Sequence, residues 1–88
     1  MKEVRFHRIF TKHFRIRILP HKKLVEQFES RLTLFVQGVR DAPLLDHPLG
    51  GSMKGLRAFS VGGDLRVIYK DWPDYYEFLD IGSHNQVY

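Results

Sequence analysis

The sequence predicts an α+β protein in which two amino-terminal helices pack on one face of a mainly antiparallel four-stranded sheet. Three observations predict it: an alternating pattern at the amino end, a long helical stripe in the middle, and a glycine pair between two strand-like runs. The element order is strand, helix, helix, strand, strand, strand. Because 88 residues are too few to close two independent cores, residues 1–88 are expected to form a single domain.

The first strand and the first helix follow from two short patterns. Apolar and polar residues alternate over Val4–His7, which is typical of a half-buried strand. Apolar residues then recur every four positions, at Phe10, Phe14 and Ile18, with Thr11 as a candidate N-cap, and this spacing predicts a short helix. The run from Phe14 to Ile18 also alternates and is rich in isoleucine, so from pattern alone a strand stays open as the alternative.

The second helix has the longest apolar stripe in the chain. Its members share one helical face: Leu24, Val25, Phe28, Leu32, Phe35, Val36 and Val39. Pro20 suits the first turn of such a helix, and Gly38 and Pro43 mark its end. A loop is expected from residue 41 to residue 52.

Two adjacent glycines predict a β-hairpin, because they tolerate the positive φ angles of a tight turn. With Gly62 and Gly63 as the two-residue loop, Phe59 lies opposite Arg66 and Arg57 opposite Ile68. The face that should cover the helices then carries Leu56, Ala58, Ser60, Leu65, Val67 and Tyr69. The opposite face carries Arg57, Asp64 and Arg66 together with Phe59, Val61 and Ile68, so we expect the two guanidinium groups to project on the same side. Residues 71–74 read as a turn, and Tyr75–Ile81 as the last strand.

Charge is distributed unevenly along the chain, whose net charge is +4. The first 23 residues hold eight basic side chains and one acidic one, whereas the last eighteen hold four acidic side chains and no Lys or Arg. A basic lobe favours a polyanion or an acidic protein as partner, although a solvated basic face that aids solubility is the plain alternative.

Several classes of protein are excluded by what the sequence lacks. With no cysteine there is neither a disulfide framework nor a thiolate zinc site. No apolar run approaches the roughly 20 residues that span a bilayer, and the amino end has no signal-peptide pattern, so a cytoplasmic protein without a membrane partner is expected. The histidines at 7, 13 and 21 lack the close spacing of metal ligands, so no metal or other cofactor is expected.

Polar side chains suited to RNA cleavage gather in the second half of the chain. They are His47, Lys54, Arg57, Asp64, Arg66, His84 and Tyr88. When RNA is cut by its own 2′-hydroxyl, a base takes that proton, an acid protonates the leaving 5′-oxygen, and cations stabilise the charge on the phosphorus centre. Histidine serves the first two roles near neutral pH and arginine the third. Each residue also has a structural alternative, as a loop hydrogen bond, a surface charge or a hairpin flank.

Four stretches of the second half resemble the RelE/ParE superfamily of bacterial toxins, and most closely its YafQ-type branch of mRNA interferases. They are DHPL at 46–49, GSMKGLR at 51–57, VGGDLRVIY at 61–69 and LDIGSH at 79–84, followed by Tyr88. The amino half matches as a basic, helical region, and the order and length of the elements match over the whole chain.

The resemblance implies a microbial ribonuclease-type fold, with a helix rather than a strand over residues 11–19. It implies the toxin of a type II toxin–antitoxin system, held inactive by an acidic antitoxin, that enters the ribosome and cuts messenger RNA as a metal-independent endoribonuclease. It assigns catalytic roles to His47, Asp64, Arg66 and His84. RNA binding is assigned to Lys54, Arg57 and Tyr88.

Two positions depart from the YafQ pattern: Ser60 stands where that branch has a second histidine, and Asp80 where it has an arginine. Serine does not shuttle protons at neutral pH without a base beside it, and a carboxylate repels phosphate unless it is turned away. Two alternatives therefore stay open. One is a ParE-like toxin that binds DNA gyrase without cutting RNA, and the other is a catalytically weakened RelE relative.

Overall fold

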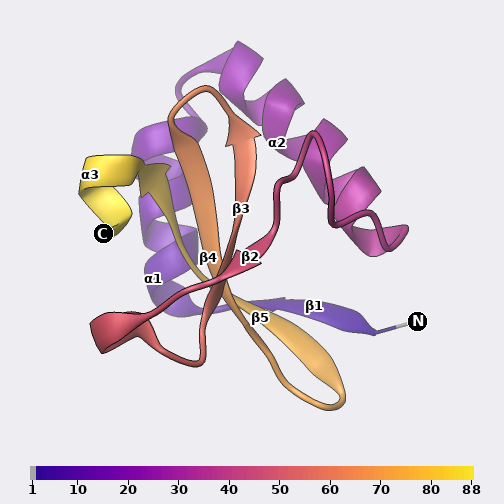
Figure 1. The fold of residues 1–88 in the computed structure, drawn as a ribbon. Coiled ribbons are helices and arrows are strands. Elements are labelled where there is room, and N and C mark those ends of the chain that lie inside the picture. Colours follow the sequence, from indigo (N-terminus) through magenta and orange to yellow (C-terminus); the bar gives the residue numbers. More distant parts are fainter. Residues whose placement is uncertain (1) are drawn as a thin grey trace.

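The computed structural model describes residues 2–88, which form a five-stranded sheet with helices on both sides (Figure 1). In chain order the elements are β1 (Glu3–Phe6), α1 (Arg8–His13), the π-helical segment η1 (Phe14–Ile18), α2 (Lys22–Val36), β2 (His47–Pro48), the 3-10 turn η2 (Gly51–Met53), β3 (Arg57–Gly62), β4 (Leu65–Asp71), β5 (Tyr75–Ser83) and α3 (His84–Val87). No helix within residues 2–88 combines the length and the apolar character needed to cross a bilayer.

The sheet order is β1-β5-β4-β3-β2, with β1 parallel to β5 and every other pair antiparallel. The predicted α+β class is confirmed, but the predicted count of four strands is wrong by one. The additional strand is β2, where His47 pairs with Ala58 and Pro48 with Arg57. Two residues that end in proline are too short to show an alternating pattern, so the sequence could not reveal this strand.

The amino-terminal elements agree in kind with the prediction and differ in their boundaries. A helix occupies residues 8–18, which excludes the strand alternative, and it begins three residues before Thr11. His7 is the N-cap in place of Thr11, because its backbone is extended and its Nδ1 accepts a hydrogen bond from Ile9 N at 3.1 Å. Pro20 lies in the turn before α2 rather than in its first turn, whereas Gly38 ends that helix with φ +93°.

The hairpin between β3 and β4 has a different register from the predicted one. Its two-residue loop is Gly63-Asp64, Gly62 pairs with Leu65, and the ladder shifts by one residue between Ser60 and Gly62. Ser60 therefore lies opposite Arg66, and Arg57 lies opposite Tyr69. Since successive strand residues point to opposite faces, this shift reverses the predicted faces of β3 and leaves those of β4 as predicted, so the two arginines project from opposite sides of the sheet.

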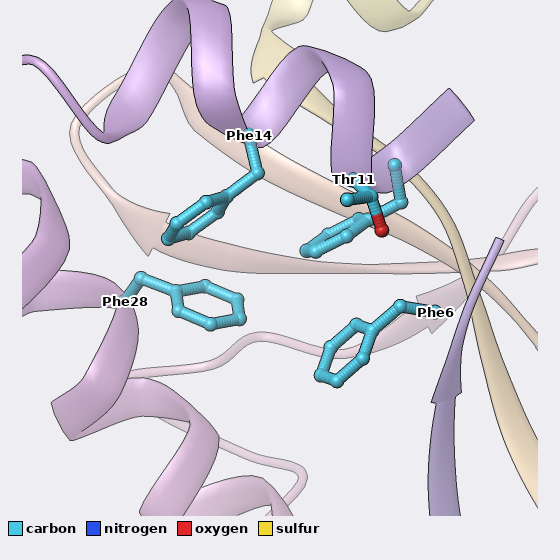
Figure 2. Close-up of a pocket in the computed structure, with 5 residues that line it drawn as sticks. Phe6, Thr11, Phe14 and Phe28 are labelled. Carbon is cyan, nitrogen blue, oxygen red and sulfur yellow. The ribbon is translucent and has the colours of Figure 1, made fainter. Parts of the chain in front are cut away.

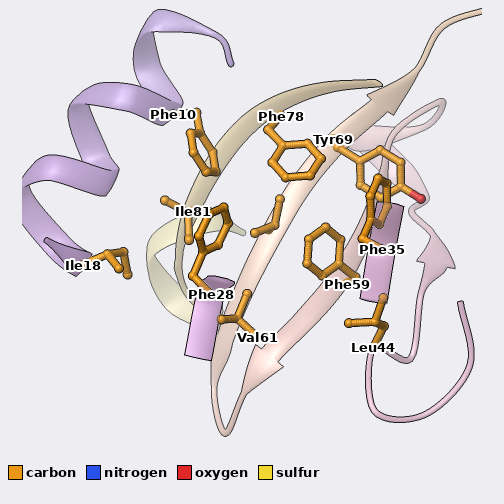
Figure 3. Close-up of a cluster of buried hydrophobic side chains, with 11 residues drawn as sticks. Phe10, Ile18, Phe28, Phe35, Leu44, Phe59, Val61, Tyr69, Phe78 and Ile81 are labelled. Carbon is orange, nitrogen blue, oxygen red and sulfur yellow. The ribbon is translucent and has the colours of Figure 1, made fainter. Parts of the chain in front are cut away.

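The main core lies between the helices and one face of the sheet (Figure 3), a face that the prediction gave correctly for β4 and wrongly for β3. It is largely aromatic: the ring of Phe35 lies 5.0 Å from those of Phe59 and Tyr69 and 5.4 Å from that of Phe78. A second, smaller cluster on the other face joins Ala58, Ile68 and Val87. It fixes α3 against the sheet and leaves the rest of that face open for polar side chains.

Candidate functional site

A cavity of about 400 Å³ opens on the face of the sheet opposite α1 and α2, and its lining contains four of the seven predicted site residues. The lining residues are His47, Leu49, Arg66, His84 and Tyr88. They come from β2 and the loop after it, from β4, and from the carboxyl-terminal segment that contains α3. The loop, strand and helix thus bring together two imidazoles, one guanidinium and one phenol that lie up to 41 residues apart in the sequence.

His47 is held at the start of β2 with one ring nitrogen available. Its Nδ1 lies 2.9 Å from the carbonyl oxygen of Leu45, and because a carbonyl only accepts, Nδ1 carries the proton. In the neutral ring Nε2 then has the free lone pair, which is the state that a general base requires. The side chain is exposed and points to the same face as Ala58, its partner on β3.

His84 is positioned by the way α3 begins. Ser83 and Gln86 form a capping box, and His84 N donates to the backbone oxygen of Asp64 at 3.0 Å. The imidazole packs edge-on against the Tyr88 ring, with the ring centroids 4.6 Å apart. Burial raises the pKa of the Tyr88 phenol, although the nearby Arg66 opposes that shift. The phenol therefore stays neutral and can donate a hydrogen bond at physiological pH.

Arg66 is anchored by one end of its guanidinium. Nη1 donates to the carbonyl oxygens of Gly63 at 2.8 Å and of Leu65 at 3.1 Å, and lies 3.4 Å from Ser60 Oγ. Within residues 2–88, the Nε and Nη2 groups of Arg66 have no hydrogen-bond partner. These two N–H groups form the side of the fork that binds two phosphate oxygens at once. Ser60, which stands where the YafQ-type branch has a histidine, thus contacts the guanidinium of Arg66.

Three predicted site residues lie outside the lining of this cavity. Asp64 sits at the hairpin turn and holds the start of α3 through its backbone oxygen, so its position fits orientation rather than proton transfer. Lys54 follows η2 and is exposed. Arg57 faces the helix-covered side, where its Nε and Nη2 each lie 2.7 Å from Asp46 Oδ1. The expectation that the guanidinium groups of Arg57 and Arg66 project on the same side of the sheet is therefore wrong.

The carboxylate of Asp80 is turned toward the helices. Its Oδ1 lies 2.6 Å from Nδ1 of His13 and 3.5 Å from Nη1 of Arg17. Asp80 does not line the cavity, and a cation on η1 compensates its charge. The departure at this position therefore does not place a bare carboxylate in the candidate site.

Replacing Gly82 by alanine is expected to disturb α3. A Cβ at this position would lie 2.6 Å from Arg17 Nη1 and 2.7 Å from Gln86 Oε1, and the latter atom accepts the hydrogen bond that caps α3. We expect the melting temperature to fall by about 5 °C, since a lost cap costs about 1 kcal/mol. Thermal denaturation followed by circular dichroism measures this. The control is Gly50→Ala, whose added methyl group would meet no atom within 4 Å, and equal melting of the two variants would refute the expectation.

Tyr69 predicts a loss of stability at alkaline pH. Its hydroxyl donates to Asp46 Oδ2 at 2.5 Å, and burial, followed by the bond to this carboxylate, raises the pKa of the phenol above its ordinary value of 10.0. Because the folded chain holds this proton more tightly than the unfolded chain, the contribution is complete below pH 10 and is lost as the pH rises further. The melting temperature of Tyr69→Phe should therefore fall less between pH 9 and pH 11 than that of the wild type. A matched Tyr75→Phe variant should keep the wild-type slope, and parallel slopes for all three proteins would contradict the prediction.

No group of three or more side chains suited to hold a metal ion occurs in the part of the chain that the structure describes. The fold and the site together define a class: small α+β domains that carry imidazole and guanidinium groups on a sheet face opposite two helices. No family model matches the sequence, and no curated protein matches it.

Solved structures identify the relatives within that class. YafQ from Escherichia coli superposes with a TM-score of 0.83 at 24% identity, over 100% of this chain and 99% of that one. A chain of the E. coli DinJ–YafQ complex gives 0.81 at 26% identity, with coverage of 100% and 99%. A copper-bound mutant toxin from Helicobacter pylori gives 0.79 at 26% identity, with both chains covered completely. The resemblance to the YafQ-type branch of the RelE/ParE superfamily is thereby confirmed, and the chain has the fold of these toxins.

Proposed function

We propose that the chain is the toxin of a type II toxin–antitoxin system and that it cleaves messenger RNA on the ribosome. The observation that carries the proposal is the convergence of His47, Arg66, His84 and Tyr88 on one open cavity. These side chains supply a base, an acid, a cation and a neutral hydrogen-bond donor, which is the set that cleavage by the 2′-hydroxyl requires.

In the proposed reaction Nε2 of His47 takes the proton of the 2′-hydroxyl, and the 2′-oxygen forms a bond to phosphorus. The bond from phosphorus to the 5′-oxygen breaks, and His84 donates the proton that this leaving oxygen needs. The products are a 2′,3′-cyclic phosphate and a free 5′-hydroxyl. The free N–H groups of Arg66 bind the phosphate oxygens while charge builds on them. The reaction needs no metal, because the side chains supply both the proton transfers and the positive charge.

The ribosome has a specific part in this proposal. The cavity is open and its histidines are exposed, so alignment of the messenger by the ribosome replaces a deep substrate pocket of the protein's own. The basic first 23 residues give the chain a surface that attracts ribosomal RNA. By analogy with the E. coli DinJ–YafQ complexes, we infer that an antitoxin covers the protein in the cytoplasm.

Inducible expression in growing bacteria, with mapping of messenger 5′ ends, tests the proposal. Growth arrest with new cuts in translated messengers is expected, and the purified chain should make the same cuts on programmed ribosomes with Mg²⁺, which the ribosome itself requires, as the only divalent metal ion added. Arrest with an intact messenger pool would reject the nuclease and favour a ParE-like mode of binding. Normal growth during expression without any antitoxin would reject the toxin itself.

A further inference from the structure

A second cavity, of about 200 Å³, lies between α1, η1, α2 and the edge strand β1, away from the candidate active site. It is lined by Phe6, Phe10, Thr11, Phe14 and Phe28 (Figure 2). Neighbouring ring centroids are 5.1 to 6.0 Å apart, so the rings form one continuous apolar wall. Although Phe6 belongs to this wall, it is 49% exposed. We call this cavity the phenylalanine groove.

The size and chemistry of the groove limit what it accepts. A volume of about 200 Å³ is below the roughly 300 Å³ at which pockets for small organic ligands begin, and it suits one large apolar side chain. The groove offers a single polar side chain, Thr11, so the polar edges of a nucleobase would lose their hydrogen bonds among the phenyl rings. These properties favour a protein partner over RNA.

The charge beside the groove indicates which kind of protein fits. On the helix surface Thr11 has Arg8 three residues before it and Arg15 four residues after it, and Lys12 is its neighbour in the chain. The three cations are exposed, and none of them forms an ion pair within residues 2–88. Carboxylates on either side of an apolar anchor would complement them, whereas a second copy of this chain would bring a groove with the same positive border.

We propose that the phenylalanine groove is the docking site for an acidic segment of a protein partner, which inserts one large apolar side chain between the four rings. The inference rests on the proposed function for the identity of the partner, which is then the antitoxin. Such an anchor typically dominates the binding energy of an interface, while the charges around it set the approach and the choice of partner. A partner docked here can be held tightly without filling the cavity that contains His47 and His84.

Peptide titration monitored by NMR of the full chain tests the proposal. The probe is a glutamate-rich peptide with one central phenylalanine, and its two controls replace the phenylalanine by alanine or the glutamates by lysine. We expect shifts of the Phe6, Thr11 and Phe14 resonances with the first peptide. Affinity should fall about tenfold or more for each control peptide, which is the range expected when one buried aromatic side chain or its charge match is lost.

Two variants place the binding in the groove. Thr11→Trp fills it and Thr11→Glu repels the acidic peptide, whereas Thr33→Trp changes an exposed position on the outer side of α2 and should bind as the wild type does. Three results would overturn the proposal: no binding of the acidic peptide, equal binding by Thr11→Trp and the wild type, or tighter binding of the lysine peptide. Tighter binding of the lysine peptide would point to a basic partner. The peptide titration does not depend on messenger cleavage. A chain that does not cut RNA can still bind the peptide, so the docking proposal and the proposed nuclease can fail independently.

Discussion

Replacement of His84 by alanine is expected to lower the rate of messenger cleavage on the ribosome by about 10²- to 10⁴-fold, the usual contribution of a general acid or base. The fold should survive, because His84 is exposed and its side chain contacts the Tyr88 ring at the surface of the cavity. Single-turnover cleavage of a short messenger on purified ribosomes measures the chemical step. A melting curve of the same preparation shows whether the fold is intact.

His47→Ala should cause a loss of similar size, for the complementary reason that it removes the base. A wild-type enzyme that uses one base and one acid has a bell-shaped dependence of rate on pH. Each single variant should lose one limb of that bell, the acidic limb with His47→Ala and the alkaline limb with His84→Ala. This pH readout separates proton transfer from a merely structural role of the two imidazoles.

The matched control is His21→Ala, because His21 is exposed, lies before α2 and makes no side-chain hydrogen bond as the N-cap of that helix. It should cleave at the wild-type rate. Cleavage within about threefold of wild type in both His47→Ala and His84→Ala would reject the proposed chemistry. Growth arrest that persists in the double variant would then favour inhibition by binding.

The register of the β3–β4 hairpin could not be predicted from the sequence. The glycine pair correctly indicated a reversal and the two strands beside it, but the alternation of residues does not reveal which glycine belongs to the loop. The ladder is irregular near Val61, and the one-residue shift turns the side chains of β3 to the opposite faces relative to those of β4. Both faces carry apolar residues, since Phe59 packs under the helices and Ile68 under α3, so hydrophobic pattern alone could not choose between the registers.

The expected site residues and the hairpin geometry used to place them fared differently in the structure. The structure brings together His47, Arg66, His84 and Tyr88, although the pairing of Arg57 with Arg66 on one face was wrong. Ser83 and Gln86 have the spacing of a capping box, so the start of α3 could have been found in the sequence. The anchoring of Arg66 by hairpin carbonyls could not, because it depends on where the turn folds back.

Arg57 stabilises the fold from the other side of the sheet. It pairs with Asp46, whose side chain is fully buried, and the same carboxylate accepts the hydrogen bond of Tyr69. This network ties the loop before β2 to β3 and β4, and His47 follows Asp46 directly in the chain. Arg57, first expected to bind RNA, therefore holds the loop that leads to His47, the proposed base.

Asp46→Ala is accordingly expected to be the most destabilising single change considered. It leaves the buried Tyr69 hydroxyl without its partner and removes the charge that balances Arg57. Breaking a buried ion pair costs about 3–5 kcal/mol, and since the Arg57 side chain is 36% exposed and regains some hydration, we expect about 2–4 kcal/mol. For a chain of this size that loss lowers the melting temperature by about 10–20 °C.

Urea and thermal denaturation measure this effect, with the exposed Asp41→Ala in the same loop as the matched control. Asp46→Asn should be intermediate, because the amide oxygen still accepts from Tyr69 while the charge pair with Arg57 is gone. At a temperature where Asp46→Ala is folded, its messenger cleavage should stay far above that of His84→Ala, since no group of the proposed reaction has been removed. If Asp46→Ala melts at the same temperature as Asp41→Ala, the network does not stabilise the fold. A folded Asp46→Ala that fails to cleave would show that cleavage depends on the way this network positions His47.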